Sequence, residues 1–481
     1  MHKNVIIVGA GISGIAAGYN LKKSCPNKSF SILEGRKNIG GTWDLFKYPG
    51  IRSDSDMHTL GFRFKPWIHD KSIADGPSIM KYLHETVDEY ELKNDILLNH
   101  QVDSANWNSE RSLWELEIKF NEEIKNMTCN FLFLCGGYYS YSKPHMPYFK
   151  NQDNFEGQII HPQFWDESLD YKNKKIAVIG SGATAITIVP AIAENADHVV
   201  MIQRSPTYVV SRPSKDAINK FLKKILPTRV TYFLIRWKNI LFQSFSFFMA
   251  KKFPERTKSK ILDLAKSEIG SDNVNQYFTP SYKPWDQRIC LVPDSDLFNA
   301  INNKKASIVT DTISEFQSDG ILLDSGKKIE ADIIITATGI ELNSLNDINV
   351  TIDNIKVVAN ERLTYKGMML SGVPNFAISF GYVNASWTLR ADLTCEYVCR
   401  LINLMDKKGV KCCMPMDDKS AYGDDKLIDF TSGYFQRGLN QMPKQGNKAP
   451  WKNYQNYIKD IFAVRLMSID DTNLKFDNFK D

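Results

Sequence analysis

The sequence is poor in cysteine and has no long hydrophobic run, and each shortage excludes a class of protein. It contains eight cysteines among 481 residues, and no two of them are spaced as Cys-x-x-Cys. This pattern favours reduced thiols in a cytoplasmic protein over a disulfide scaffold or a cysteine-ligated metal, so we expect no metal site. No charge-free apolar stretch reaches the roughly 18 residues that a membrane-spanning helix needs.

An excess of charge of one sign is also missing. The 60 basic and 55 acidic residues leave a net charge of +5, which is too dilute to indicate a nucleic-acid-binding protein. Hydrophobic residues make up 43% and charged residues 24% of the chain, as in ordinary soluble globular proteins. The first residues, MHKNVIIVGAG, run straight into a strand pattern, so we expect no secretory signal. A chain of this length suggests about three domains.

What the sequence does contain is two copies of one local plan. Lys3–Glu34 and Lys174–Arg204 each consist of an apolar run, a glycine-rich turn, a helical stretch and a second apolar run. This order is typical of a βαβ unit with two parallel strands. The sequence therefore predicts an α/β fold with two Rossmann-like dinucleotide-binding domains.

The first glycine-rich turn reads Gly9-x-Gly11-x-x-Gly14, with Ser13 inside it. Glycines at these positions allow a tight bend, the close approach of a pyrophosphate and close packing of helix against strand. The phosphates then lie at the helix N-terminus, where free N–H groups favour an anion. Glu34 ends the second strand 20 residues after Gly14, where a carboxylate accepts hydrogen bonds from ribose hydroxyls. This turn predicts a dinucleotide with an unmodified ribose.

The second turn reads Gly180-x-Gly182-x-x-Ala185, and its second strand ends in Arg204 rather than in an acid. A guanidinium pairs with a 2′-phosphate in a bidentate manner, whereas a carboxylate would repel it. The turn therefore predicts NADPH, and the alternative for Arg204 is a solvated surface side chain. The residues expected around this nucleotide are Gly180, Gly182, Thr184, Ala185, Arg204 and Ser205.

Two dinucleotide sites in one chain indicate electron transfer between two cofactors. The N-terminal site of a flavoprotein with two Rossmann domains usually holds FAD, so we expect FAD at the first turn and NADPH at the second. A disulfide reductase of this architecture would need a redox cysteine pair near the flavin, and the N-terminal region has none with that spacing. Dioxygen is therefore the expected electron acceptor.

Three further motifs resemble those of the type I Baeyer–Villiger flavin monooxygenases. FEGQIIHPQFWD resembles the family fingerprint, in which related nitrogen- and sulfur-oxidising enzymes carry Tyr or Phe where this chain has Trp165. GGTWDLFKYPGIRSD, which ends at Asp54, resembles the second family motif, and Asp332–Gly339 resembles the third. The resemblance covers nearly the whole chain. The fingerprint positions are Phe155, Gly157, His161, Trp165 and Asp166.

The resemblance implies a reaction and a set of residues that carry it. In this family a C4a-peroxyflavin inserts one oxygen atom of O₂ into a ketone to give an ester or lactone, and sulfides or thioamides are further substrates. By resemblance, Arg288 is the fixed cation that stabilises the developing negative charge, and Asp54 is its carboxylate partner. The plainer alternatives are a surface arginine and a helix N-cap. Gly41, Thr42 and Trp43 are expected to line the flavin pocket.

The fingerprint histidine, His161, invites a catalytic role that the resemblance does not support. In this family the fingerprint lies in a linker between the FAD and NADPH domains. His161 is therefore expected to bond backbone atoms or to transmit domain movement rather than to abstract a proton.

The expected domain organisation follows from these landmarks. A helical insert interrupts the NADPH domain, and the FAD domain is discontinuous. We assign residues 1–150 and 340–481 to the FAD domain, 151–167 to the linker, 168–211 and 286–339 to the NADPH domain, and 212–285 to the insert. A further helix is expected at Ala391–Lys408 in the C-terminal part.

The insert contains an aromatic segment at Val230–Ala250. Its apolar residues recur at helical spacing, which predicts a buried or inter-domain helix in the first instance. The alternative is a helix face that touches a membrane surface or lines a substrate entrance. The recurring residues are Phe233, Trp237, Leu241, Phe245 and Phe248.

Three other functions stay open at this point. A flavin monooxygenase that mainly oxygenates sulfur or nitrogen would depend less on Arg288, because it uses a protonated oxidant. An NADPH oxidase would release hydrogen peroxide without an organic product. A redox-sensing flavoprotein that binds a partner would hold a flavin that NADPH does not reduce.

Overall fold

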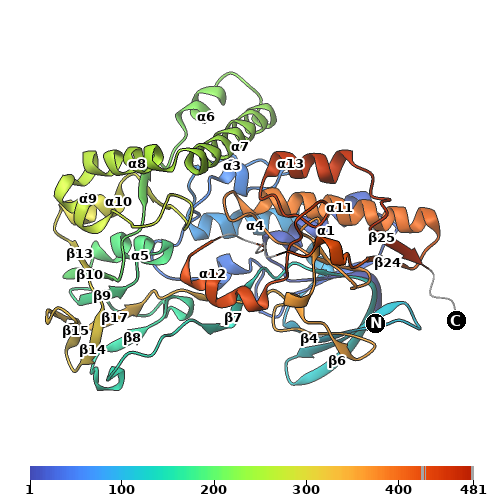
Figure 1. Ribbon diagram of the computed structural model, residues 1–481, viewed down its shortest axis with the longest axis horizontal. Helices are drawn as coiled ribbons and strands as arrows, with labels where there is room; N and C mark the ends of the chain where they lie inside the picture. The colour runs from blue at the N-terminus through green and yellow to red at the C-terminus, as the bar shows by residue number, and fades with distance from the viewer. Residues whose placement is uncertain (424–426, 428–429, 478–481) are drawn as a thin grey trace.

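Two β-sheets covered by helices form the body of the protein (Figure 1). The computed structural model describes residues 1–423, 427 and 430–477. Figure 1 shows the first sheet on the right, the second sheet on the left, and the helices of residues 217–277 above them. Strands alternate with helices in both halves of the chain, which confirms the predicted α/β fold class.

The first sheet is built around the N-terminal βαβ unit. β1 (His2–Val8) pairs in parallel with β2 (Phe30–Leu33), and α1 (Ile12–Ser24) connects the two strands. β6 (Glu123–Leu134) pairs with the other side of β1, so its carboxyl end lies beside the first glycine-rich turn. In the described part of the chain nine strands form this sheet. One of them, β23 (Phe376–Ile378), pairs with β6. The other eight follow the order β20 (Ile355–Lys356), β19 (Asn349–Ile352), β4 (His100–Asn108), β5 (Leu113–Phe120), β6, β1, β2 and β3 (Ile96–Leu97).

The second sheet is parallel throughout. Its order is β13 (Ala306–Thr310), β10 (His198–Gln203), β9 (Lys175–Ile179), β17 (Ile333–Thr336) and β8 (Gln158–Ile160), with α5 (Ala183–Ala193) following β9. Because the strands share one direction, their carboxyl ends lie on one edge, where a nucleotide binds in such folds. Gly180, Arg204 and Ala337 follow three of these ends.

The chain crosses between the sheets twice, and the two crossing segments pair with each other. β7 (Tyr139–Pro144) leads away from the first sheet, β18 (Ile340–Leu342) leads back to it, and the two strands are antiparallel. α12 (Gly433–Gly438) packs against β18. This junction brings three distant parts of the chain to the edge where both glycine-rich turns lie.

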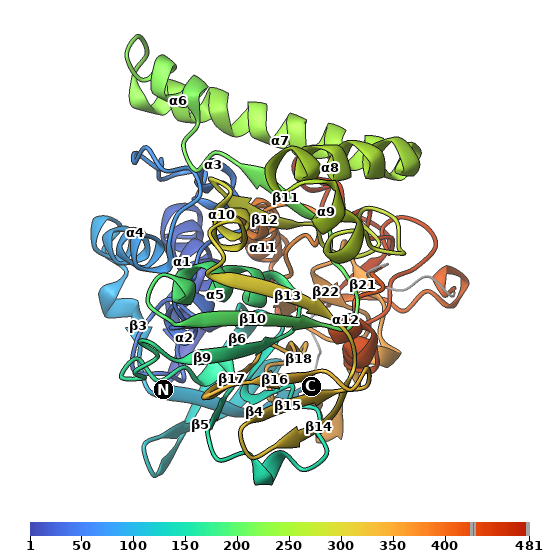
Figure 2. The same ribbon diagram turned by 90° about the vertical axis from the view of Figure 1, so that its left-hand side faces the viewer.

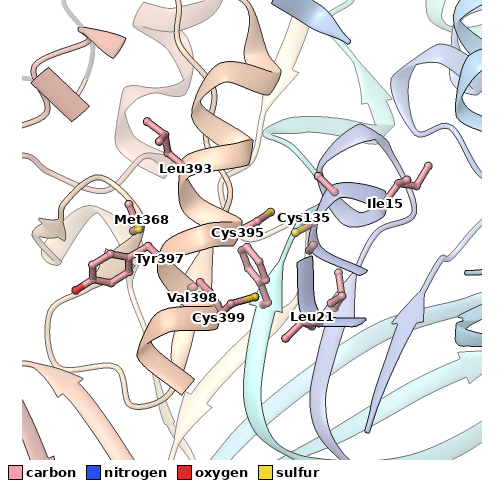
Figure 3. Close-up of a cluster of buried hydrophobic side chains, with 14 of the residues drawn as sticks. Ile15, Leu21, Cys135, Met368, Leu393, Cys395, Tyr397, Val398 and Cys399 are labelled. Atoms are coloured by element: carbon pink, nitrogen blue, oxygen red, sulfur yellow. The ribbon is translucent and has the colours of Figure 1, made fainter. Parts of the chain in front are cut away.

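The core of the first half lies between α1, α11 (Trp387–Lys408) and the sheet. Figure 3 shows Cys395 and Cys399 of α11 directed toward α1, which presents Ile15 and Leu21. All four side chains are almost fully buried. The helix predicted at Ala391–Lys408 is confirmed, and it begins one turn earlier, at Trp387.

The insert leaves the body of the protein through a parallel pair of short strands. β11 (Val209–Arg212) leads into the insert and β12 (Cys290–Pro293) returns from it. Figure 2 shows α7 running along the outermost edge of the molecule, with α6 and α8 beside it. No helix that the structure describes is long and apolar enough to cross a membrane. The insert helices are α6 (Ala217–Leu222), α7 (Thr228–Lys252), α8 (Pro254–Ile269) and α9 (Ser271–Tyr277).

The expectation that the aromatic face of α7 is buried is wrong. Phe233, Leu241, Phe245 and Phe248 are each more than half exposed, while Trp237 is partly buried against the first core. The helix is instead held by its opposite face, where Tyr232 and Arg236 bond to the backbone of residues 58–62. Periodicity gave the helix correctly, but it does not show which of two apolar faces meets the protein.

The remaining elements surround this framework. They are α2 (Thr42–Leu45), α3 (Met57–Leu60), α4 (Gly76–Glu89), α10 (Asp296–Asn302), α13 (Tyr457–Ile461), a π-helical turn (Phe462–Leu466), and the small sheets β14 (Ile313–Gln317) with β15 (Gly320–Leu323) and β16 (Lys328–Glu330), β21 (Thr364–Tyr365) with β22 (Met369–Leu370), and β24 (Cys412–Pro415) with β25 (Leu474–Asp477).

Candidate functional site

A cavity of about 1270 Å³ lies where the two sheets and the insert meet. Both glycine-rich turns contribute to its wall, as do the carboxyl end of β6, the segment before β12 and one side of α7 and α8. The predicted site residues that line it are Gly9, Gly11, Ser13, Glu34, Gly41, Thr42, Trp43, Asp54, Thr184 and Arg288.

The first glycine-rich turn needs glycine at two positions for packing and leaves the third beside the cavity. Gly9 has φ +98°, and a Cβ atom added there would lie 2.9 Å from the backbone of Gly136. A Cβ atom at Gly14 would lie 1.8 Å from the carbonyl oxygen of Gly9. At Gly11 it would meet only two backbone atoms of Gly41, at 3.5 and 3.8 Å, so Gly11 is free to admit a ligand at the N-terminus of α1.

Glu34 lies at the end of β2 with both carboxylate oxygens held by the backbone. Oε2 accepts a hydrogen bond from the Ala10 N–H at 2.8 Å, and Oε1 accepts one from the Arg36 N–H at 3.0 Å. Burial raises the pKa of Glu34, although the two N–H groups and the Arg36 charge oppose that rise. A carboxylate oxygen accepts more than one hydrogen bond, so the group still has capacity for ribose hydroxyls.

The second glycine-rich turn is more open than the first. Gly180 has φ +133°, and a Cβ atom there would lie 2.4 Å from the Ala337 carbonyl oxygen. A Cβ atom at Gly182, which caps α5, would meet nothing within 4 Å. Thr184 lines the cavity, and Ala185 is buried in the third position. A ligand can therefore reach this turn from solvent.

Arg204 and Ser205 are exposed and lie outside the cavity wall. They still adjoin the second turn, because the Gly180 N–H donates to the Ile202 carbonyl at 2.8 Å. The Ser181 hydroxyl also donates to the Ser205 carbonyl, at 3.2 Å. Arg204 thus occupies the end of the strand next to the turn, where the ribose of a bound nucleotide lies in this fold.

Arg288 and Asp54 face the same cavity from different halves of the chain. Arg288 is partly buried and donates to the Val383 carbonyl at 3.5 Å. Burial works to lower the pKa of Arg288, but Tyr434, Tyr139, Tyr138 and Asp54 raise it above its ordinary value. The guanidinium therefore stays charged at neutral pH.

Asp54 is exposed and lines the cavity. The surrounding protein atoms desolvate its carboxylate and raise the pKa of Asp54, while the charges of Arg288 and Arg52 oppose the rise. Arg52 itself forms an ion pair with Asp296. Asp54 and Arg288 therefore influence each other through the cavity, and the structure shows no ion pair between these two described residues.

The segment around Tyr48 joins the two halves. Tyr48 is buried among core residues of the second half, and its pKa is raised by burial and by the Asp54 charge, while a hydrogen bond with Thr184 lowers it. A Cβ atom at Gly50, whose φ is +78°, would lie 2.8 Å from Ala191 of α5. Trp43, by contrast, packs against the first core. The second family motif therefore spans both halves of the cavity.

The fingerprint residues lie outside the cavity wall. His161 is buried; its Nδ1 accepts from the Gln163 N–H at 3.1 Å, so its Nε2 donates to the Gly339 carbonyl at 3.2 Å. Burial lowers the pKa of His161, which keeps this neutral form. A Cβ atom at Gly157 would lie 2.3 Å from the Asp332 carbonyl. Phe155 and Trp165 pack in the second half, and Asp166 accepts hydrogen bonds from Ser168.

Arg36 and Tyr141 line the cavity and have no counterpart in the sequence prediction. Arg36 forms an ion pair with Asp44 at 2.7 Å and lies over the Tyr141 ring. Trp387 donates to the Ser13 hydroxyl at 2.7 Å. The available signal was the Gly136–Gly137 pair, which follows the strand of β6 as the other glycine-rich turns follow β1 and β9.

Two Rossmann-like sheets whose glycine-rich turns open into one cavity define a flavoprotein that takes two dinucleotides. Family models agree, because one for flavin-binding monooxygenase-like proteins matches residues 69–378 and one for NAD(P)-binding Rossmann-like domains matches residues 7–70. The chain belongs to the flavin-binding monooxygenase-like family. It is an NADPH-dependent flavin monooxygenase, and this part of the prediction is confirmed.

Relatives with similar sequences span the whole chain. The chain is 48% identical over 477 residues to the FAD-containing monooxygenase EthA of Mycobacterium tuberculosis, covering 99% of this chain and 98% of that protein. It is 46% identical over 483 residues to the probable FAD-binding monooxygenase AlmA of Acinetobacter baylyi, covering 100% of this chain and 97% of that protein. These full-length matches confirm the resemblance stated from the motifs.

Solved structures show the same fold at lower identity. An oxidized steroid monooxygenase bound to NADP has a TM-score of 0.81 at 20% identity, and the match covers 99% of this chain and 100% of that one. A cyclohexanone monooxygenase bound to epsilon-caprolactone has a TM-score of 0.77 at 18% identity, covering 99% and 100% of the two chains.

Proposed function

We propose that the protein is an NADPH-consuming, FAD-dependent Baeyer–Villiger monooxygenase. A ketone, O₂, NADPH and one proton give an ester or lactone, water and NADP⁺. One oxygen atom enters the substrate, the other leaves as water, and NADPH supplies two electrons. The names of the full-length relatives and of the structures that share the fold support this proposal.

The residues of the first turn fit FAD. Gly11 leaves the N-terminus of α1 open to a pyrophosphate, and Glu34 is held by the backbone in a position to accept from ribose hydroxyls. Asn384, in the cavity wall, has a buried side-chain oxygen without a hydrogen-bond partner, which suits a donor on a bound ring. When bound, FAD supplies the reaction of dioxygen with reducing equivalents.

The residues of the second turn fit NADPH. The N-terminus of α5 is open at Gly182, and Arg204 is exposed beside it. An enclosed first site and an open second site suit a resident cofactor and an exchanging one, respectively. Thr184 places the second turn on the wall of the same cavity, so hydride transfer between the two ligands needs no separate carrier.

The observation that carries the proposal is the charged Arg288 on the cavity wall that both turns share. A permanent cation in this position stabilises negative charge that develops on a ketone oxygen under attack. The negative charge of the Asp54 carboxylate partly balances the positive charge of Arg288. Oxygen transfer to a sulfide develops less negative charge and depends on the cation less.

Product identification tests the proposal. The purified holoenzyme would be supplied with NADPH, air and a panel of linear, cyclic and aryl ketones with one thioether, and the products identified by gas chromatography and mass spectrometry. An ester or lactone is the expected result. Sulfoxide as the sole product would favour heteroatom oxygenation instead. NADPH consumption with hydrogen peroxide alone would favour an oxidase.

Arg204→Ala is expected to raise KM for NADPH by about tenfold to a hundredfold, because hydrogen bonding to a charged group contributes roughly 1.5–3 kcal/mol in total at such an exposed site. KM for NADH should stay unchanged, since NADH has no 2′-phosphate. Steady-state kinetics with both nucleotides measures the effect. Lys174→Ala is the matched control, because Lys174 is an exposed cation at the opposite end of β9. An equal rise in both KM values would contradict the assignment.

A further inference from the structure

The insert presents an apolar face to the outside of the molecule. Successive turns of α7 place its outward side chains on one side of the helix, opposite the face that Tyr232 and Arg236 anchor. Phe233 is 59%, Leu241 is 53% and Phe245 is 62% exposed, although such residues are usually buried. The exposed apolar residues of the insert are Ile218, Phe221, Ile225, Val230, Phe233, Leu234, Leu241, Phe242, Phe245, Phe248 and Leu264.

The same face extends onto a distant part of the chain. Figure 1 shows α13 beside α7 along the upper side of the molecule, and the Trp237 ring lies 6.4 Å from that of Tyr457 in α13. The turn that follows α13 exposes Phe462 and Leu466, at 57% and 69%. Contiguous exposed apolar surface of this kind marks an interaction site rather than ordinary surface.

Strong positive charge surrounds this apolar face. Residues 217–260 contain 11 basic residues and one acidic residue, Glu255, whereas the whole chain is nearly balanced. Arg236 is buried with Asp392, but Lys220, Lys224, Arg229 and Lys252 are exposed. Aromatic and aliphatic side chains flanked by cations are the composition of helices that lie in the interface of an anionic bilayer.

The cavity opens at this face. Phe242, Phe245 and Leu264 line the cavity and are each at least half exposed. The exposed cations Arg256 and Lys260 line it too. The rim of the opening therefore has the same apolar and basic character as the surface around it.

We propose that the exposed face of α6 and α7 is a docking surface for an anionic lipid bilayer, and that lipophilic substrates enter the cavity from the bilayer through the opening between α7 and α8. The helices would lie in the headgroup region with their aromatic side chains among the acyl chains. Docking is independent of the reaction, whereas the entry route rests on the proposed function.

Co-sedimentation of the holoenzyme with vesicles tests the docking. Vesicles of equal parts phosphatidylcholine and phosphatidylglycerol should bind the protein, and vesicles of phosphatidylcholine alone should bind it more weakly. The double variant Phe233→Gln with Leu241→Gln should bind about tenfold more weakly, because two apolar side chains that insert into the bilayer are lost. Neither residue lines the cavity, and both are exposed, so flavin content should be unchanged.

Matched variants separate docking from a general change of surface. Ile124 and Ile355 are 67% and 74% exposed and lie in β6 and β20 of the first sheet, away from α7, so Ile124→Gln with Ile355→Gln should bind like the wild type. Lys220→Glu with Lys224→Glu should weaken binding about tenfold. Lys172→Glu with Lys174→Glu, on exposed residues of the second half, should not.

The proposal is overturned if the wild type fails to bind the anionic vesicles, or if control and test variants lose binding equally. It is also overturned if the Phe233/Leu241 variant only dissociates a dimer in sedimentation velocity, since the face would then serve a second copy of the chain.

The entry route has a separate measurement. For a long-chain ketone dissolved in the vesicles, the Phe233/Leu241 variant should have a lower kcat/KM than the wild type, because it binds the vesicles more weakly. Its turnover of a short water-soluble ketone should be unchanged. An equal effect on both ketones would overturn the entry route. Vesicle binding without oxidation of either ketone would overturn the proposed function and leave the docking surface standing.

Discussion

Replacing Arg288 by alanine is expected to reduce ester formation by about a hundredfold to a thousandfold, the range seen when one group that stabilises an oxyanion is removed. NADPH oxidation should continue in part, with the electrons appearing as hydrogen peroxide. The measurement is the ratio of ester to NADPH consumed, together with a peroxide assay.

This loss is expected because the described groups whose charges act on Arg288 cannot replace it. The hydroxyls of Tyr138, Tyr139 and Tyr434 lie around the guanidinium, but they carry no positive charge. Arg52 faces the cavity, but it is engaged with Asp296. Without Arg288 the Asp54 carboxylate also loses its largest stabilising charge, so its pKa should rise further.

Arg212 provides the matched control. It also lines the cavity, where its guanidinium lies 5.1 Å from the Phe242 ring. Arg212→Ala should therefore preserve the ratio of ester to NADPH consumed. Full ester formation by Arg288→Ala would refute the assignment, and an equal loss in both variants would mean that the total positive charge of the cavity, rather than Arg288 itself, supports ester formation.

Replacing Arg236 by alanine is expected to cost about 3–5 kcal/mol of stability, because it leaves a buried carboxylate without its partner. Arg236 and Asp392 are 3% and 2% exposed. The guanidinium also donates to the His58 and Gly61 carbonyls, at 2.8 and 2.7 Å. Arg236 and Tyr232 together anchor this face of α7, so loss of Arg236 should make the insert sensitive to proteolysis first.

The pH dependence of this loss gives a specific readout. Burial raises the pKa of Asp392 to about 6 even though the Arg236 charge opposes the rise. Without Arg236 the folded-state pKa should rise further above its unfolded value. A carboxyl group with a raised folded pKa contributes stability at low pH and loses it as the pH rises. The loss of folding stability caused by Arg236→Ala should therefore be larger at pH 8 than at pH 5.

Urea unfolding at both pH values and limited proteolysis of the insert measure the effect. Lys238→Ala is the control, since Lys238 lies two residues further along α7 and pairs with Asp216 near the surface. That change should cost less than about 1 kcal/mol. A deficit for Arg236→Ala that does not vary with pH would show that lost packing, rather than the uncompensated charge, explains it.

Features that depend on a few neighbouring residues could be predicted from the sequence. Glycine is required at position 14 because a side chain there would overlap the carbonyl oxygen of Gly9. Both residues belong to the same turn, so this requirement can be predicted from the local sequence. Glu34 follows its strand for the same local reason. The helix at Ala391–Lys408 follows from its own periodicity. These elements gave the α/β class and the positions of both turns.

What the sequence determined by itself is therefore the two glycine-rich turns, their strands and helices, and the family to which their motifs belong. Only the tertiary structure decided which faces of these helices and strands pack against the rest of the protein. Tyr48 packs in the second half although its segment directly follows the N-terminal βαβ unit in sequence. Tyr138 and Tyr434 come together around Arg288 from distant segments. The aromatic face of α7 remains outside because Arg236 and Tyr232 anchor the other face. Burial depends on contacts between residues far apart in the chain, and no local pattern encodes those contacts.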